Sequence, residues 1–313
     1  MRERWVIMDV DTGVDDSMAI MLAGAQKHLH ILALTSVFGN NAADKTAYNT
    51  QKIAEMLGIS APVAKGSERP MIDPPIDYSA GLGPLIHGTD GLGNVGSRLP
   101  EPSRVLSTLT AVDLMAKVIR ECPEKVTIVA TGPLTNIAVF LLSWPELTDR
   151  IEEIAIMGGA AFGGNLAFSV EANVGHDTEA AAIVFRSPVR KTVFGLDATM
   201  GVYMTDEERE CMAETGKTGA FLKDCLQPYA DIYRQLANWP GAVLHDSLPV
   251  AWLIDESLFE MKPVKITVEQ NGKYSRGATV CDFNTEDDTC RIAMGADRQG
   301  IIDLHLQAVR NYQ

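Results

Sequence analysis

Short apolar runs rich in valine and isoleucine recur along the chain, and they constrain the fold more than any other feature. The segments between them carry apolar residues at the helical period, so each run is expected to be a buried strand that leads into a helix. This βαβ rhythm predicts an α/β fold with a mostly parallel sheet covered by helices on both faces. The runs are WVIMDV, HILALTSV, VTIVA, EIAIM and RKTVF.

Helical periodicity places helices between these strands, and the pattern changes towards the C-terminus. Helical segments dominate from about residue 205 to 254. Residues 264–269 and 275–282 then have the pattern of an antiparallel pair around Asn271-Gly272, and a closing helix starts at about Arg298. The earlier helices are expected at residues 17–25, 42–57, 107–121, 134–142 and 178–186.

Residues 66–102 are rich in glycine and proline and show little periodicity, so they predict a long loop. Its length and composition make it a candidate lid over a site. No repeat, low-complexity tract or polar linker marks a domain boundary. Residues 1–313 are therefore expected to form a single domain.

Composition and charge exclude several classes of function. The formal net charge of −14 disfavours nucleic acid and strongly anionic ligands as partners. No apolar run reaches the ~20 residues of a membrane span, and the N-terminus lacks the pattern of a signal peptide, so we expect a cytoplasmic protein without membrane association. The 5 cysteines are scattered without a C-x-x-C pair, which favours reduced thiols over disulfides or a thiolate metal site.

The turn after the first predicted strand is unusually acidic, because Asp9, Asp11, Asp15 and Asp16 lie within residues 9–16. The first two project to one side of the strand, and the last two start the helix, where the helix dipole favours negative charge. This edge of an open α/β sheet is where ligands bind. Carboxylates this close need a cation or donors to compensate them, so the turn favours a metal or catalytic site.

Simpler interpretations exist for single members of this turn. A lone aspartate at a helix start is most often only a cap. Asp9 lies beside the apolar strand, so the alternative to a metal or catalytic role is that it only holds the scaffold together through hydrogen bonds.

Other polar residues follow the later strands or stand in the long loop and in the last helices. Each alone is explained as a turn, cap, surface or core residue, but an α/β fold would bring several of them to the acidic crevice. Thr135 and Asn136 are interpreted as helix-start residues. The candidates are Asn40, His87, Thr131, Asn165, Glu171, Asn173, Tyr229, Tyr233, His245 and Asp246.

Six motifs occur in the order and spacing of the nucleoside hydrolases, and the chain resembles that family to about Ile254. They are D-x-D-x-G-x-D-D near the start, G-N after the second strand, H-G-x-D-G in the long loop, T-G-P-L-T-N, E-x-N and the late H-D. The resemblance to these inosine-uridine preferring enzymes implies a Rossmann-like fold, hydrolysis of the N-glycosidic bond of ribonucleosides, and a homodimer or homotetramer.

The resemblance implies that Ca²⁺ is held by Asp11, Asp16, Asp246 and the backbone carbonyl of Thr131, an all-oxygen set of the kind that Ca²⁺ prefers. Asp11 matches the general base that takes a proton from a metal-bound water. Asn40 matches a residue that orients the water or the sugar.

The resemblance also implies which residues contact the ribose. Asp15 and Asn173 match groups on the 2′ side, Asp246 also reaches the 3′-hydroxyl, and Asn165 with Glu171 matches contacts to the 5′-hydroxyl.

Residues around the nucleobase follow in the same way. His245 matches a general acid for the leaving base, and His87, Tyr229 and Tyr233 match positions where they stack on the base or assist proton delivery.

The chain departs from the family pattern at a few positions near these residues. Val10 differs from the branch of the family that carries cysteine there, Thr12 stands where proline is usual, and Ser247 stands where proline or alanine is common. Ala172 replaces a larger aromatic residue, and residues 166–168 are atypical. None of these changes removes an implied metal ligand.

Two rival functions remain open at this stage. Residues 9–12 superficially match the D-x-D motif of haloacid dehalogenase-type phosphatases, but no convincing lysine and acidic pair follow. A non-catalytic, calcium-dependent nucleoside- or ribose-binding protein is the other, and Asp11 and His245 argue against it because binding needs neither a base nor an acid.

Overall fold

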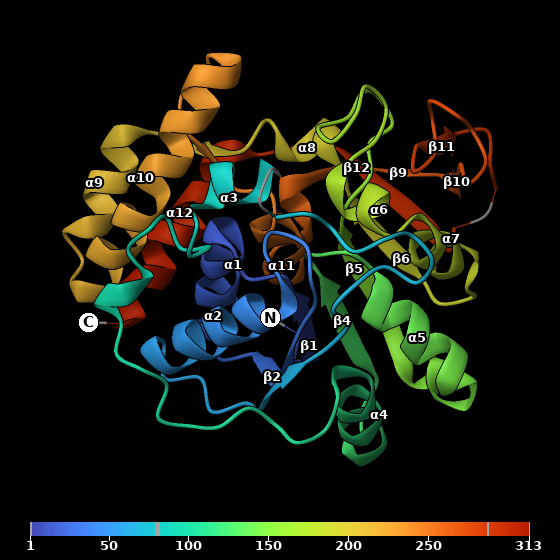
Figure 1. The fold of residues 1–313 in the computed structure, drawn as a ribbon, viewed down its shortest axis with the longest axis horizontal. Helices are drawn as coiled ribbons and strands as arrows, with labels where there is room; N and C mark the ends of the chain where they lie inside the picture. Colours follow the sequence, from blue (N-terminus) through green and yellow to red (C-terminus); the bar gives the residue numbers. More distant parts are fainter. Residues whose placement is uncertain (1, 79–81, 287, 313) are drawn as a thin grey trace.

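The computed structural model describes residues 2–78, 82–286 and 288–312. Among these residues, eight strands form a central sheet in the order β3-β2-β1-β4-β5-β6-β12-β9 (Figure 1). Every neighbouring pair is parallel except β12 and β9. The strands are β1 (Arg4–Val10), β2 (Leu29–Ser36), β3 (Val63–Lys65), β4 (Val126–Ala130), β5 (Ile151–Met157), β6 (Lys191–Phe194), β9 (Phe259–Pro263) and β12 (Cys290–Ala296).

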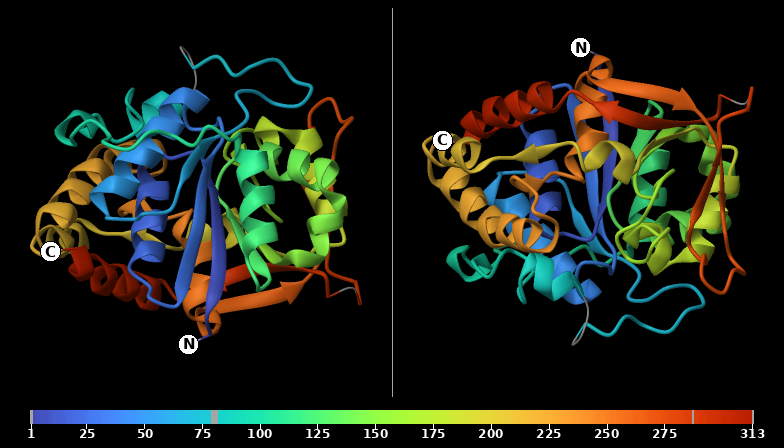
Figure 2. Two further views of the ribbon diagram at one scale, coloured as in Figure 1. Left: turned by 90° about the horizontal axis from the view of Figure 1, so that it is seen from below. Right: turned by 90° about the horizontal axis from the view of Figure 1, so that it is seen from above.

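Helices cover both faces of this sheet, and Figure 2 shows the two layers on either side of the strands. The fold class predicted from the sequence is therefore confirmed. The helices are α1 (Val14–Gly24), α2 (Ala43–Met56), α3 (Leu82–His87), α4 (Ala111–Glu121), α5 (Thr135–Ser143), α6 (Ala172–His176), α7 (Thr178–Arg186), α8 (Leu196–Thr199), α9 (Asp206–Ala213), α10 (Lys217–Ala237), α11 (Ser247–Ile254) and α12 (Arg298–Ala308).

Alternating side chains of β1 divide the apolar core between the two layers. Val6, Met8 and Val10 are buried in the core formed with α1, α10, α11 and α12. Ile7 points the other way, into the core formed with α4, α5 and α7. Burying such a side chain stabilises the fold by roughly 1.5–3 kcal/mol, so the sheet anchors both layers.

The order of strands reverses at β1, because β2 and β3 lie on one side of it and β4 lies on the other. At such a switch point the loops after two neighbouring strands diverge and leave a crevice at their carboxyl ends. The acidic turn leaves β1 here, and Thr131 follows β4, with its N–H donating to the carbonyl of Asp9 at 2.9 Å. The topology thus places the acidic turn at the expected ligand-binding edge.

Most predicted elements are confirmed, with different ends. Strand β4 and helix α7 have the predicted bounds. Helix α1 begins at Val14 rather than residue 17, so Asp15 and Asp16 form its first turn. Helix α4 begins at Ala111 rather than residue 107, because the hydroxyl of Thr110 caps it by accepting from the N–H of Asp113 at 3.2 Å.

The long loop predicted over residues 66–102 contains two short helical elements that were not predicted. Helix α3 and a 3₁₀ turn, η1 (Gly96–Arg98), lie within it, and both are too short to produce a visible period. The part of that prediction on residues 79–81 lies outside the described residues.

The C-terminal prediction was correct for the hairpin and incomplete for the sheet. Strands β10 (Lys265–Val268) and β11 (Thr279–Asp282) pair antiparallel, as expected. Strands β9 and β12, which were not predicted, extend the central sheet. A further small pair joins β7 (Tyr203–Met204) to β8 (Ala242–Val243). Within the described part of the chain, no helix has both the length and the apolar character to cross a bilayer.

Candidate active site

The acidic turn is compact because Gly13 has no side chain. A Cβ on Gly13 would come within 2.5 Å of Nδ1 of His87 and 2.8 Å of Nδ2 of Asn40. The N–H of Gly13 donates to Oδ2 of Asp16 at 2.8 Å, which closes the first turn of α1 on itself. The glycine therefore lets residues of the later loops approach the carboxylates.

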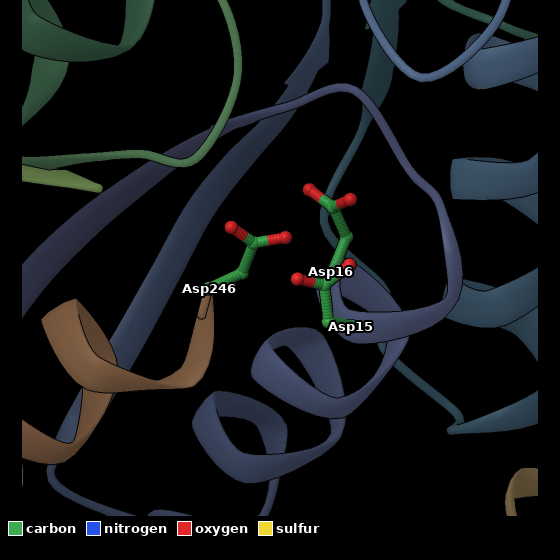
Figure 3. A group of neighbouring side chains, drawn as sticks. All are labelled: Asp15, Asp16 and Asp246. Atoms are coloured by element: carbon green, nitrogen blue, oxygen red, sulfur yellow. The ribbon is translucent and has the colours of Figure 1, made fainter. Parts of the chain in front are cut away.

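Three buried carboxylates converge at this turn. Asp15, Asp16 and Asp246 each bring one oxygen into a group whose members all lie within 4.8 Å of one another. Figure 3 shows that the first two come from the start of α1 and the third from the residue before α11, with their carboxylates facing each other. Burial and the charge of Asp16 raise the pKa of Asp15 to about 7. A divalent cation would relieve this repulsion.

Asp11 and Thr131 add oxygen atoms beside this group. Oδ2 of Asp11 accepts the N–H of Asn40 at 2.7 Å, whereas Oδ1 is buried and has no hydrogen-bond partner among the described residues. Burial, followed by the charge of Asp16, raises the pKa of Asp11. The hydroxyl of Thr131 donates to Oδ1 of Asp16 at 2.7 Å. The atoms that could bind a metal here are all oxygen atoms, which are the ligands that a hard divalent cation prefers.

Asp9 lies outside this group and has protein partners of its own. Its Oδ1 accepts from the hydroxyl of Thr35 at 2.7 Å and from Nδ2 of Asn136 at 2.8 Å. Nδ2 of Asn136 also donates to the carbonyl of Ser36 at 2.9 Å. Asp9 thus ties β1 to β2 and α5, which agrees with its interpretation as a scaffold group.

A cavity of about 660 Å³ opens above the acidic group, within the range typical of ligand sites. Asp11 and Asp16 do not line it directly but lie behind Asn40 and Thr131, to which they are hydrogen-bonded. The structure brings the other candidate residues together in its lining. These are Asp15, Asn40, His87, Thr131, Asn165, Glu171, Asn173, Tyr229, Tyr233, His245 and Asp246.

One end of the cavity is built by α6 and the loop before it. The carboxylate of Glu171 caps α6 by accepting the N–H of Asn173 at 2.9 Å, and it also accepts the N–H of Gly159 at 2.7 Å. Nδ2 of Asn173 donates to the carbonyl of Thr131 at 2.8 Å. These bonds fix the amide and carboxylate groups next to the acidic group.

The other end carries a row of aromatic and imidazole rings. The centroids of His87 and Tyr229 lie 5.4 Å apart, those of Tyr229 and Tyr233 5.0 Å, and those of Tyr233 and His245 5.9 Å. The hydroxyl of Tyr233 bonds Nε2 of His245 at 2.7 Å, and the hydroxyl of Thr199 bonds its Nδ1 at 2.8 Å. This end suits a flat, uncharged ring.

Both histidines of this row are neutral at neutral pH. Burial lowers the pKa of His245 to about 4 and that of His87 to about 3. The N–H of Val14 donates to Nδ1 of His87 at 3.2 Å, so this ring carries its proton on Nε2. Each ring can therefore give a proton only if another proton replaces it.

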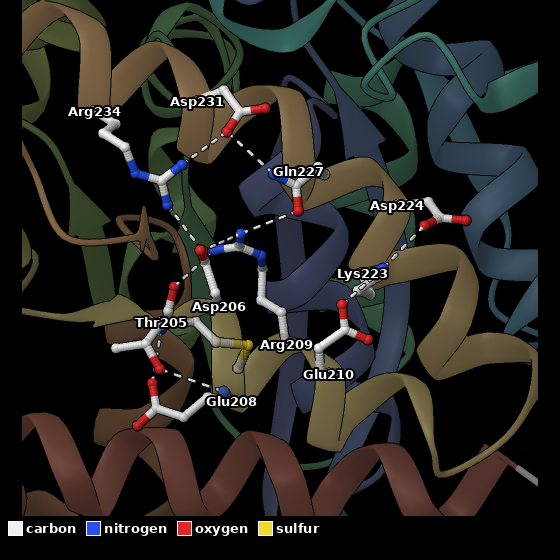
Figure 4. Close-up of polar contacts among 11 residues, drawn as sticks. Thr205, Asp206, Glu208, Arg209, Glu210, Lys223, Asp224, Gln227, Asp231 and Arg234 are labelled. Atoms are coloured by element: carbon white, nitrogen blue, oxygen red, sulfur yellow. Dashed lines mark hydrogen bonds and ion pairs between the residues drawn. The ribbon is translucent and has the colours of Figure 1, made fainter.

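A closed network of side-chain hydrogen bonds holds α10 against α9 (Figure 4), and none of its five residues belongs to the cavity lining. Asp206 accepts from Arg209 at 2.7 Å and from Arg234 at 2.8 Å. Arg234 also donates to Asp231, Gln227 donates to Asp231, and Arg209 donates to Gln227. This hydrogen-bond network fixes the rotation of α10, the helix that carries Tyr229 and Tyr233.

Several residues in the cavity lining or next to it were missed by the sequence analysis. Thr199, in the short helix α8, contacts His245 from 46 positions away, and no local pattern indicates such a contact. Tyr78 and His176 line the cavity itself. Only the three-dimensional arrangement distinguishes these residues from ordinary loop and helix-end residues.

Comparisons with known proteins agree with this geometry. The profile of the inosine-uridine preferring nucleoside hydrolases matches residues 6–303. A pyrimidine-specific ribonucleoside hydrolase, RihA, of Citrobacter koseri is 39% identical over 313 residues, with 98% of each chain covered. The solved structure of a purine-preferring ribonucleoside hydrolase from Gardnerella vaginalis superposes with a TM-score of 0.93 at 31% identity, covering 99% of each chain.

A second solved structure, an inosine-guanosine nucleoside hydrolase, has a TM-score of 0.87 at 26% identity and covers 99% of this chain and 98% of its own. The range that the family profile matches, residues 6–303, contains the acidic turn, the cavity residues and the late His245-Asp246 pair. The chain therefore belongs to the inosine-uridine preferring nucleoside hydrolase family and is a ribonucleoside hydrolase.

Proposed function

We propose that this chain hydrolyses the N-glycosidic bond of purine and pyrimidine ribonucleosides with the help of Ca²⁺, giving ribose and the free base. The observation that carries this proposal is the convergence of three elements in one cavity. They are a buried acidic group, a set of fixed amide and carboxylate groups, and a row of neutral rings. A ribonucleoside has the matching parts, because its hydroxylated sugar is joined directly to a flat base.

The cation site consists of Asp11, Asp16, Asp246 and the carbonyl of Thr131, with Asp15 beside it. Its fit rests on the buried, unpartnered Oδ1 of Asp11 and on a donor set made of oxygen atoms. When bound, Ca²⁺ supplies a fixed positive charge that orients and acidifies a water molecule and binds sugar hydroxyls.

Asp11 is the general base of the proposed reaction. The N–H of Asn40 fixes Oδ2, and the second lone pair of this oxygen would accept a proton from the attacking water, since Oδ1 is the atom left for the cation. The side-chain amide of Asn40 donates to Asp16 at 3.1 Å, which places it between the two acids to orient the water or the sugar.

The groups that hold the sugar also stabilise positive charge on the ribose ring. Asp15 and Asn173 take the 2′ side, Asp246 reaches the 3′-hydroxyl, and Asn165 with Glu171 takes the 5′-hydroxyl. As the bond to the base breaks, positive charge grows on the ribose. The nearby carboxylates stabilise this charge more than they stabilise the neutral substrate.

The leaving base needs a proton, and His245 is placed to deliver it. If the hydroxyl of Thr199 donates to Nδ1, then Nε2 of His245 carries the proton and faces the hydroxyl of Tyr233. A proton can then pass from the imidazole along this bond towards the base, while His87 and Tyr229 contact its face. The neutral state of His245 fits donation through a relay rather than by a permanent cation.

The proposed unit is a single domain of residues 1–313, because the two apolar cores share one sheet. Assembly into a homodimer or homotetramer remains a prediction from the family resemblance, and light scattering of the purified chain measures it.

One experiment tests reaction, metal and specificity together. The protein is incubated with uridine, cytidine, inosine and adenosine, with and without a chelator, and reducing sugar is measured. We expect release of ribose that the chelator abolishes and that added CaCl₂ restores. Release of phosphate from phosphate esters without release of ribose would support the phosphatase instead, and tight binding without turnover would support the binding protein.

A further inference from the structure

The cavity lining near α6 includes apolar side chains beside the polar Glu171 and Asn173. Leu166, Ala172 and His176 line this end of the cavity together, and we call these three residues the 5′ wall. Phe162, at the mouth of the same end, has an exposed fraction of 75%. The cavity volume of about 660 Å³ is mid-range for drug-sized ligands, and an unsubstituted nucleoside is smaller than most of these.

The 5′ wall is one continuous surface. The carbonyl oxygen of the Asn165 side chain accepts the N–H of Ala172 at 2.9 Å, which holds the loop against the start of α6. A Cβ on Gly175 would lie 2.6 Å from Cδ2 of Leu166, so this leucine packs directly on the backbone next to His176. Ala172 contributes only a methyl group to the lining, between Glu171 and Asn173.

His176 gives this wall an unsatisfied polar atom. Its Nδ1 is buried and has no hydrogen-bond partner in the described part of the chain. Burial lowers the pKa of His176 to about 4, so the ring is neutral at neutral pH. An unpaired buried nitrogen costs free energy.

The charges around this end exclude an anionic ligand group. Glu171 and Asp197 both line the cavity here, and Asp197 accepts the N–H groups of Ala161 at 2.7 Å and Phe162 at 3.0 Å. No lysine or arginine belongs to the described lining. A phosphate on the sugar would meet carboxylates and a neutral imidazole, so an uncharged group is favoured.

We infer that the 5′ wall is a subsite for an uncharged substituent on the 5′ carbon of the ribose, such as an alkylthio or alkoxy group. The chain then hydrolyses nucleosides that carry such a group. Water adds to the anomeric carbon, the base leaves with a proton, and the substituted sugar is released unchanged at its 5′ position. This inference rests on the proposed function, which places Asn165 and Glu171 at the 5′ side of the sugar.

The test compares four substrates with one base, either uracil or hypoxanthine, whichever parent nucleoside is hydrolysed faster. They are the parent, its 5′-deoxy-5′-methylthio and 5′-O-methyl derivatives, and its 5′-monophosphate. We expect kcat/KM for the two uncharged derivatives to lie within about tenfold of the parent, and the monophosphate to be at least ~100-fold worse. Uncharged derivatives that fall ~100-fold below the parent, or a monophosphate that equals them, would overturn the inference.

Substitutions locate the effect. Ala172→Phe fills the 5′ wall and should lower the ratio of kcat/KM for the methylthio derivative to that for the parent by ~10-fold or more. Ala167→Phe is the matched control, because Ala167 is exposed in the same loop and is not part of the cavity lining. Ala172→Leu repeats the test with a smaller side chain if the first variant does not fold. An unchanged ratio in the folded Ala172 variant, or an equal drop in the control, contradicts the subsite.

Failure of the proposed function gives a different result. If no unsubstituted nucleoside is hydrolysed, the proposed function is wrong, and calorimetric binding of the methylthio derivative still tests the subsite, since binding needs no turnover. Binding that Ala172→Phe weakens ~10-fold would support the 5′ wall, and the absence of binding would refute it.

Discussion

Removal of one carboxylate from the acidic group should stabilise the metal-free protein. Without a cation, the carboxylates of Asp15, Asp16 and Asp246 repel one another across at most 4.8 Å. Two unit charges at this separation repel by about 3 kcal/mol at an effective dielectric constant of ~20. Asp246 faces two such neighbours, and uptake of a proton relieves part of the repulsion, as the raised pKa of Asp246 indicates.

Asp246→Asn keeps the shape of the side chain and removes its charge. We therefore expect the free energy of unfolding in a chelator to rise by about 3 kcal/mol. A shift of ~2 °C in Tm for each kcal/mol in a chain of this size makes the expected increase about 6 °C. The wild type should instead gain about 2.7 kcal/mol from free Ca²⁺ at ~100 times its Kd, and the variant should gain little.

The assay is thermal unfolding at pH 8, followed by circular dichroism, in EDTA and in millimolar CaCl₂. Asp303→Asn is the matched control, because Asp303 is exposed on α12 and its loss should leave both Tm values unchanged. A variant at Asp246 that is less stable than the wild type in EDTA, and that Ca²⁺ still stabilises, would refute both the repulsion and the ligand assignment.

Three further predictions concern catalysis and pH. Asp11→Asn should lower kcat by ~10²- to 10⁴-fold without a loss of Tm in EDTA, because a general base contributes that much to the rate, and near-wild-type release of reducing sugar would contradict the assignment. His245→Ala should slow the hydrolysis of inosine and uridine by ~10²-fold but hardly affect 4-nitrophenyl riboside, whose leaving group needs no proton, so equal losses on both would argue against a leaving-group acid. In EDTA, stability should fall as the pH rises from ~4 to ~7, because burial raises the pKa values of Asp9 and Asp15 to about 7 and the folded state then holds protons that the unfolded state has released. Each group contributes up to ~1.4 kcal/mol per pH unit in that window, and urea midpoints that increase from pH 5 to pH 8 would contradict the sign.

The sheet could be predicted from the sequence where its strands are buried on both faces. Strand β4 is buried at all five positions, and its sequence VTIVA contains no charged residue. Strand β9, at the edge of the sheet, is partly exposed and ends in Pro263, and β12 mixes Arg291 and Gly295 with apolar residues. Their pairing depends on contacts distant in the sequence, so no local period indicated it.

The residues of the candidate site that belong to sequence motifs could be predicted, and the others could not. The density of aspartates after β1 indicated a cation or catalytic site, and the family resemblance indicated its other members. Thr199 was missed because its bond to His245 joins residues 46 positions apart, and His176 was missed because its place in the cavity lining depends on the packing of the short helix α6. The scaffold contacts of Asp9 with Thr35 and Asn136 were likewise invisible, since they join separate strands and a helix.

The two sides of α10 have separate tasks, and this separation matters for how new specificities arise. Gln227, Asp231 and Arg234 anchor the helix to α9, while Tyr229 and Tyr233 face the cavity. Mutations on the cavity side leave the anchoring network intact, so selection can explore new base preferences there while the helix keeps its position. Divergence within such a lineage should therefore accumulate at the tyrosine positions before it reaches the anchor.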